Sequence, residues 1–205
     1  MLDVCLLGTG GMMPLPNRWL TSLMLRHNGS NMLIDCGEGT QVQLRKNKIK
    51  FNRIKHIFIS HLHGDHYLGL IGLLSSMHLL GRVNAIHIFA VPELELILKQ
   101  QFELTYVKLN FEIIFHHLTA KSTAIVMEDK IMTVKAIPLK HRIACYGFLF
   151  EEKLKERGVD PDAIKKYDLK IPEILALKAG KDVVRGEITM PNKDVTFDPP
   201  KPKSY

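Results

Sequence analysis

Residues 58–70, FISHLHGDHYLGL, place three histidines and an aspartate within six positions, directly after an apolar, strand-like run. Side chains two residues apart point the same way at the end of a strand, so His61 and His63 can reach one ion. Gly64 then allows the chain to turn sharply. Packing explains a single histidine but not this cluster, and the stretch therefore predicts a strand, a turn and a helix built around a metal site.

Asp65 and His66 follow at the entry to the expected helix, where they can face a second ion beside the first. Imidazole nitrogens and carboxylate oxygens are ligands for zinc, and they also suit manganese or iron. A bound zinc ion lowers the pKa of its water to about 7, which supplies a nucleophile at neutral pH. A neighbouring carboxylate can orient that water and take its proton. The pattern therefore predicts a hydrolytic centre with two metal ions.

Short apolar runs alternate with longer helical patterns along the first 140 or so residues. Strands are expected at residues 4–8, 22–27, 31–37, 56–61, 85–91, 111–115 and 131–139. Helices are expected at residues 39–48, 67–81 and 92–105, of which the second is apolar almost all round and should be buried. Some strands follow one another without a helix between them. The chain therefore reads as α/β of the α+β type, with several antiparallel hairpins.

The composition is that of a globular protein, with 46% hydrophobic and 24% charged residues in 205. This length suits one sizeable domain, or a domain with an appendage. No apolar run is long enough to span a membrane, and the N-terminal sequence lacks the features of a signal peptide. Three cysteines, Cys5, Cys36 and Cys145, are too few for a disulfide framework. We expect buried, reduced thiols in a cytoplasmic protein.

Basic residues are concentrated in one short segment. Six lysines and arginines fall within residues 45–55, and no acid lies between Glu38 and Asp65. Such a run is typical of a solvated helix end and loop. It would also serve as a surface that faces phosphates. The excess of 28 basic over 21 acidic residues permits an anionic partner without naming one.

The character of the sequence changes near residue 150. Beyond it the apolar periodicity weakens and prolines interrupt it repeatedly. We interpret this segment as a protruding arm or linker with short helices at residues 151–158 and 171–180, and not as a second core.

Several motifs make the chain recognisable. HLHGDH (61–66) resembles the signature of the metallo-β-lactamase superfamily. Four further segments resemble the ribonuclease Z family, the endonucleases that trim the 3′ trailer from precursor tRNA: LIDCGEGTQVQL (33–44), GLIGLLSSMHLLGR (69–82), PLKHRIACYGF (138–148) and LALKAGKDV (175–183). The resemblance runs from Leu6 to about Pro200, nearly the whole chain.

The resemblance implies a metallo-β-lactamase αββα sandwich. Residues 1–150 would form the N-terminal portion of that domain, and residues 151–198 a flexible arm that grips tRNA away from the cut. Residues 199–205 would begin a C-terminal portion that is missing here. The family's bridging aspartate and later histidines have no counterpart, because the sequence stops at DPPKPKSY. The chain is therefore expected to be truncated, with an exposed inner sheet that favours a homodimer or a higher oligomer.

The resemblance also assigns roles to single residues. His61, His63 and His141 would bind the first zinc ion, and Asp65 and His66 the second. Asp65 would also be the general base.

Four basic residues would contact precursor tRNA. Arg18 would lie near the scissile phosphate, in the segment GTGGMMPLPNRWLTS (8–22), which resembles the family's first loop although Trp19 departs from its usual asparagine. Lys46, Lys178 and Lys181 would touch the tRNA backbone. The remaining histidines are expected to be structural or on the surface: His56, His78, His87, His116 and His117.

Three functions fit these observations. The first is a zinc-dependent endoribonuclease that cuts precursor tRNA by two-metal hydrolysis, although the missing C-terminal ligands leave the activity of the truncated chain open. The second is a non-catalytic homologue that binds tRNA without cutting it, because losing two ligands weakens the second metal. The third is another superfamily hydrolase of small esters or phosphodiesters, which the expected arm argues against.

Overall fold

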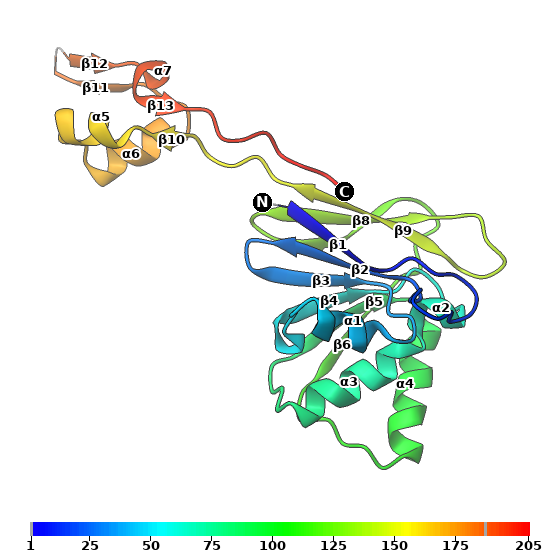
Figure 1. The fold of residues 1–205 in the computed structure, drawn as a ribbon. Coiled ribbons are helices and arrows are strands. Elements are labelled where there is room, and N and C mark those ends of the chain that lie inside the picture. Colours follow the sequence, from blue (N-terminus) through cyan, green and yellow to red (C-terminus); the bar gives the residue numbers. More distant parts are fainter. Residues whose placement is uncertain (1, 187) are drawn as a thin grey trace. The chain divides into compact units, whose positions relative to one another are not determined.

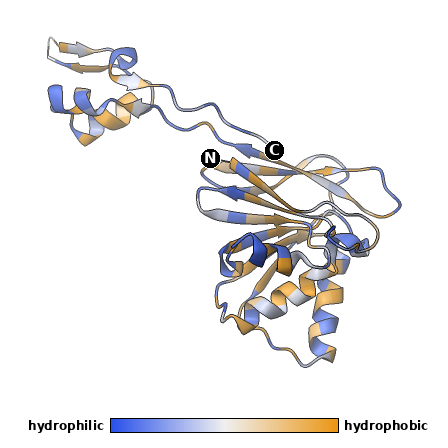
Figure 2. Cartoon of the chain, viewed as in Figure 1, coloured by the Kyte–Doolittle hydropathy of each residue, from blue (hydrophilic) through white to orange (hydrophobic). Residues whose placement is uncertain are grey.

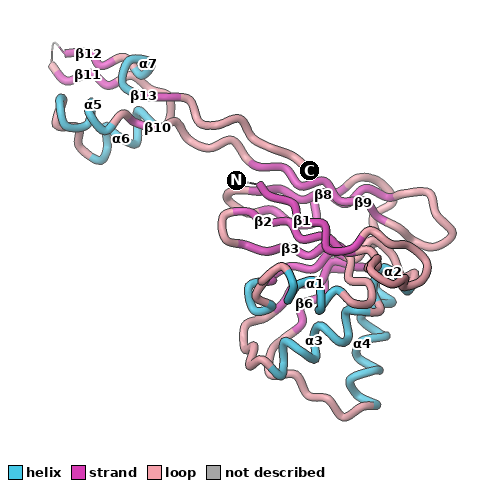
Figure 3. Tube along the Cα trace, in the orientation of Figure 1, coloured by secondary structure: helices cyan, strands magenta, loops and turns pink. Residues whose placement is uncertain are grey.

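The computed structural model describes residues 2–186 and 188–205, which divide into two compact units. The first unit holds the described residues 2–128 and 134–150, and the second holds residues 129–133, 151–186 and 188–205. Figure 1 gives the labels of their helices and strands, and Figure 3 shows the helices, strands and loops in separate colours.

The first unit is built on a six-stranded sheet whose strands follow chain order. They are β1 (Leu2–Gly8), β2 (Ser22–His27), β3 (Ser30–Ile34), β4 (Ile54–Phe58), β5 (Ile86–Ala90) and β6 (Ile113–His117). The first three strands pair antiparallel, and the pairs from β3 to β6 are parallel. The parallel half needs crossovers, which the helices supply.

The helices cover one face of this sheet (Figure 1). They are α1 (Thr40–Lys46), the short 3₁₀ helix η1 (Phe51–Arg53), α2 (Gly64–Tyr67), α3 (Gly69–Leu79) and α4 (Pro92–Leu104). Leu73 and Met77 of α3 and Leu94 of α4 are buried in one core with Ile57 of β4 and Ile88 of β5. The expected helix over residues 67–81 is divided between α2 and α3. Burying these apolar side chains against the sheet is the main contribution of the helices to the stability of the fold.

The opposite face of the sheet packs against a second sheet of three strands, β7 (Ala124–Glu128), β8 (Met132–Pro138) and β9 (Tyr146–Glu152). Phe58 of β4 stacks on Phe89 of β5 at 4.5 Å between ring centroids. Phe150 of β9 meets Phe58 edge-on at 5.2 Å. Figure 2 shows hydrophobic residues along these strands. The helix layer and two sheets are the α–β–β order of the expected sandwich, and the predicted fold class is confirmed.

The second unit has a small core of its own. Its elements are β10 (Gly158–Val159), α5 (Pro161–Lys166), α6 (Ile171–Lys178), β11 (Val183–Arg185), β12 (Ile188–Met190), α7 (Asn192–Val195) and β13 (Thr196–Phe197). Leu177 is fully buried in this core with Leu169, Val183 and Met190. The helix expected at residues 171–180 is present as α6. The expectation that this segment has no core is wrong, since its short elements pack on one another.

The helix expected at residues 151–158 is also wrong. Glu151 and Glu152 continue β9, and irregular backbone joins them to β10. The backbone N–H of Glu152 donates to the carbonyl of Lys203 at 2.8 Å, and that of Lys153 donates to Ile131 at 2.9 Å. These hydrogen bonds to residues distant in the sequence hold the backbone in an extended conformation. They therefore override the helix propensity of glutamate and lysine.

Candidate metal and hydrolytic site

The histidine loop begins where β4 ends. Strand β4 stops at Phe58, so His61 and His63 lie in the loop beyond it and not on the strand that the sequence suggested. The backbone N–H of Ile59 donates to the carbonyl of Phe89 on β5, at 2.9 Å. On the other side of the loop, Cys36 donates to the carbonyl of His66 at 2.7 Å. The loop is therefore fixed from two directions.

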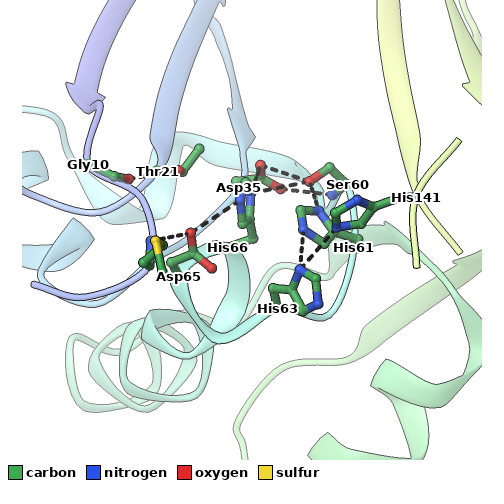
Figure 4. A network of polar contacts seen from close by, with 10 residues as sticks. Gly10, Thr21, Asp35, Ser60, His61, His63, Asp65, His66 and His141 are labelled. Carbon is green, nitrogen blue, oxygen red and sulfur yellow. Dashed lines mark hydrogen bonds and ion pairs between the residues drawn. The ribbon is translucent and has the colours of Figure 1, made fainter. Parts of the chain in front are cut away.

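Three histidines from two loops converge at one point (Figure 4). One ring nitrogen from each of His61, His63 and His141 lies within 4.8 Å of the others. Nδ1 of His63 is 3.1 Å from Nε2 of His61 and 3.1 Å from Nε2 of His141. His141 comes from the loop after β8, 78 residues further along the chain than His63. Three imidazoles in this arrangement could hold one divalent transition-metal ion.

The surroundings of His61 suit a metal ligand. Burial lowers the pKa of His61 to about 4, and the neighbouring histidines contribute in the same direction. Its ring is therefore neutral at physiological pH, which is the form that binds metals. The Ser60 hydroxyl lies 2.9 Å from Nδ1 of His61 and orients the ring so that Nε2 faces the other histidines.

Asp65 and His66 lie beside the three histidines. Nε2 of His66 is 3.5 Å from Oδ2 of Asp65, and the same oxygen accepts a hydrogen bond from the backbone N–H of Met12 at 2.9 Å. Burial opposes ionisation of Asp65, but the Met12 N–H and the charge of His66 outweigh it, so the pKa of Asp65 is lowered. Among the described residues, His61, His63 and His141 have ligand atoms close enough together to hold one metal ion. Asp65 and His66 are not part of this group.

Asp35 is a site residue to which the sequence assigned no role. Its Oδ2 lies 2.6 Å from Nδ1 of His66 and accepts a hydrogen bond from the Ser60 hydroxyl at 2.9 Å. Burial lowers the pKa of His66, but the hydrogen bond and charge of Asp35 outweigh it and leave the pKa raised. Asp35 is itself buried and has a φ of 54°. Left-handed backbone is uncommon for residues other than glycine, and such positions recur at functional sites.

The first loop, which contains Arg18, reaches the site through Met12. Gly10 donates its backbone N–H to the carbonyl of Trp19 at 2.7 Å, and the Thr21 hydroxyl donates to Gly10 at 3.0 Å, so the loop closes on itself. Arg18 is exposed in this loop, and its guanidinium donates to the carbonyl of Thr9 at 3.2 Å. Its cationic group remains accessible to an anion.

The basic side chains of residues 45–55 are exposed on the first unit. The Lys46 ammonium lies over the ring of Trp19, 5.3 Å from its centroid. All six basic side chains are exposed: Arg45, Lys46, Lys48, Lys50, Arg53 and Lys55. We call these six residues the basic face. Positive charge beside an aromatic ring is a common arrangement for contacts with nucleic acid.

Lys178 and Lys181 belong to the second unit. Lys181 is exposed, and Lys178 lines a hollow of about 570 Å³ in that unit. Lys155, Arg157 and Lys201 line the same hollow. These cations outnumber its acids, Glu156 and Asp198, and the hollow is suited to an anionic ligand.

Four of the other histidines have protein partners outside the site. Nδ1 of His87 lies 2.9 Å from Nε2 of His116, and Nε2 of His117 lies 2.6 Å from Oε2 of Glu95. Nδ1 of His78 accepts a hydrogen bond from the backbone of Asn110 at 3.2 Å. These contacts fit the structural roles expected for them.

Comparisons with known proteins match this architecture. The family model described as Anti-Pycsar protein Apyc1 matches residues 2–166. The chain is 41% identical to ribonuclease Z of Bacteroides fragilis over 207 residues, which cover 99% of this chain and 68% of that protein. It resembles the crystal structure of the short form of human tRNase Z with a TM-score of 0.68, at 30% identity and 86% coverage of each chain.

A metallo-β-lactamase fold protein from Bacillus subtilis shares the fold, with a TM-score of 0.56 at 19% identity over 73% of this chain and 57% of that one. The chain spans about two thirds of the length of the curated relatives that it matches. None of the helices in the described residues combines the length and the hydrophobicity that crossing a membrane requires.

Proposed function

Because the chain belongs to the ribonuclease Z family, and to the sequence family of the Apyc1 model, we propose that it acts as a metal-dependent endoribonuclease that removes the 3′ trailer from precursor tRNA. The observation that carries the proposal is the convergence of His61, His63 and His141 on a ribonuclease Z framework. In this reading the reaction is hydrolysis of one phosphodiester bond, which leaves a 3′ hydroxyl on the tRNA.

The residues of the site divide the chemistry between them. His61, His63 and His141 would hold a zinc ion, and Asp65 and His66 a second ion next to it. Bound zinc supplies Lewis acidity and a water of lowered pKa. Asp65 is ionised at neutral pH, because its pKa is lowered, and its carboxylate would take the proton of the attacking water. Arg18 would pair with the phosphate that is cut.

The substrate would be held through its backbone phosphates. The basic face, with Lys46 over Trp19, would contact the tRNA on the first unit. Residues 151–198 would act as the gripping arm, where Lys178 lines a cationic hollow and Lys181 is exposed. Contacts of this kind fix the register of a nucleic acid without reading its sequence.

The test is cleavage of a precursor tRNA labelled in its 3′ trailer, with zinc-saturated protein and with protein treated with EDTA. We expect zinc-dependent release of the trailer at the mature 3′ end, and loss of this product in His63→Ala. Retention of tRNA on the protein without any cleavage would favour the non-catalytic tRNA-binding function. Cleavage of a chromogenic phosphodiester but not of the tRNA would favour another hydrolase of the superfamily.

Zinc as the metal, a cytoplasmic location and a homodimer are further parts of the proposal. Imidazole ligands suit zinc, with manganese as the second choice. The three cysteines are free, as in proteins of a reducing compartment. Dimerisation would cover apolar side chains such as Leu6 on the edge strand β1, which is 63% exposed. Light scattering is expected to give the mass of two chains, and the mass of one chain would contradict the homodimer.

A further inference from the structure

A hollow of about 230 Å³ lies in the first unit. It is lined by Leu62, Val91, Glu93, Ile143 and Ala144. Leu62 lies between His61 and His63 in the sequence, and Ile143 and Ala144 follow His141. Three of its five lining residues are therefore sequence neighbours of the metal-binding histidines, and the hollow lies in the same unit of the structure.

The walls of this hollow are aliphatic apart from one acid. Val91 is buried and Leu62 is partly buried, whereas Glu93, Ile143 and Ala144 are exposed. Aliphatic walls beside a phosphodiester site accommodate the flat face of a nucleobase, because every base has an apolar face. The walls alone do not distinguish one base from another.

Glu93 is the single charged group in the lining, and it is an unusual one for a site that receives a phosphodiester. Lys140 and Arg142, on either side of His141, are exposed and suit phosphate, whereas a carboxylate repels it. An ionised carboxylate accepts hydrogen bonds and donates none. Glu93 also sits in the first turn of α4, where an acid favours the helix, so its two roles must be separated experimentally.

We propose that this hollow binds a nucleobase that carries an exocyclic amino group, at the nucleotide next to the scissile phosphate, with Glu93 as the acceptor. The inference rests on the proposed function. Cytosine presents an N4 amino group that can donate to a glutamate carboxylate, whereas uracil presents the O4 oxygen at the same place, which the carboxylate repels. The hollow would therefore select cytosine over uracil, two bases of equal size.

The test measures binding of fluorescein-labelled oligocytidylate and oligouridylate of equal length to the zinc-saturated full chain, by fluorescence anisotropy. A gel after each titration checks that the probe is intact. The unsubstituted protein is expected to bind the cytidylate about 10-fold to 100-fold more tightly, as one hydrogen bond to a charged group implies. In Glu93→Gln the ratio should fall to about one, because the amide both accepts and donates.

Glu103→Gln is the matched control. It removes the same charge from the last turn of the same helix, at an exposed position that does not line the hollow. It should keep the preference for cytidylate, and thermal unfolding of both variants shows any effect on α4 itself. Equal affinity for the two probes in the unsubstituted protein, or an unchanged ratio in Glu93→Gln, would overturn the inference.

The two proposals fail separately. Preference for cytidylate without any cleavage of precursor tRNA would overturn the proposed function and leave the base-binding hollow standing. Cleavage of precursor tRNA with no preference between the probes would overturn the hollow and leave the function standing.

Discussion

Asp35 connects the side chains that the proposed chemistry needs. It contacts His66 directly and reaches His61 through the Ser60 hydroxyl. A hydrogen bond that the ring N–H donates to a carboxylate fixes the tautomer and the orientation of a metal-binding histidine. The left-handed backbone of this residue costs free energy, which the hydrogen bonds from Ser60 offset in part.

Replacing Asp35 with asparagine should weaken metal binding without removing a ligand. We expect a loss of zinc affinity of about 10-fold to 100-fold. The neutral amide lacks the negative charge of the carboxylate and does not orient the His66 ring in the same way. Competition with a chromophoric chelator measures the affinity. Asp3→Asn is the control, because Asp3 pairs with Arg26 on the surface. Equal affinity in Asp35→Asn and the unsubstituted protein would show that Asp35 has no such role.

At the scale of residues, the sequence is informative about the local part of the site. His61, His63, Asp65 and His66 are adjacent in sequence and lie together in the structure. The contribution of His141 came only from the family resemblance, because a single histidine after PLK has no pattern of its own. Asp35 received no role because it fell within the expected strand at residues 31–37, where a single aspartate has no metal-binding pattern of its own.

The elements α2 and α3 are seated against the loop after β3 at a distance that only glycine permits. The backbone N–H of Gly69 donates to the carbonyl of Cys36 at 2.9 Å. A Cβ atom on Gly69 would collide with the carbonyl oxygen of Gly37. The start of α3 therefore fixes the backbone of His66 and Asp65 relative to Asp35.

Gly69→Ala should destabilise the protein by about 1–3 kcal/mol, because the added methyl group forces two backbone segments apart. Urea unfolding measures the change. Gly147→Ala provides the comparison, since a Cβ there would meet only the side chain of Leu139 at ordinary contact distances. A Gly69→Ala protein as stable as Gly147→Ala would argue against the tight seating of α3.

His116 on β6 should make the stability of the sheet depend on pH. Burial, and then the charge of His87, lowers the pKa of His116 below its ordinary value of 6.5. The unfolded chain therefore takes up a proton first as the pH falls, so this contribution to stability is complete above pH 6.5 and is lost toward the lowered pKa. Urea unfolding of metal-free protein at pH 7.5 and pH 5 tests it. His116→Gln should show a smaller decrease, and an equal decrease would contradict the assignment.

At the scale of elements, strong hydrophobic periodicity was the reliable guide. The strands that became β4 and β5 and the helix that became α4 were all predicted from it. Strand β7 was not predicted, because its side chains are all partly or fully exposed and give no clear alternation. The helix wrongly expected at residues 151–158 reflects a local propensity that hydrogen bonds to residues distant in the sequence override.

The net charge of +7 is unevenly distributed, and the basic face concentrates part of it on the first unit. Attraction between such a surface and tRNA phosphates would be long-ranged and sensitive to salt. Resemblance and charge together predicted the family and an anionic partner from the sequence, and the family is confirmed by the comparisons.

Replacing Lys46, Lys48 and Lys50 together with alanine should weaken binding of precursor tRNA and lower its dependence on salt. The slope of log affinity against log salt should decrease by about 0.7 to 0.9 for each phosphate that the variant no longer neutralises. Filter binding across a salt series gives both quantities. The control replaces three exposed lysines elsewhere on the same unit, Lys99, Lys108 and Lys121. Equal slopes in the two triple variants would exclude the basic face as a tRNA-binding surface.

The metal content of the purified chain tests the central claim most directly. Protein saturated with zinc and then desalted should retain at least one zinc ion per chain, measured by elemental analysis. His63→Ala should retain less, because His63 contacts both of the other histidines, while His78→Ala on α3 should match the unsubstituted protein. A chain that retains no zinc, or a His63→Ala variant that retains as much as the unsubstituted chain, would contradict the account.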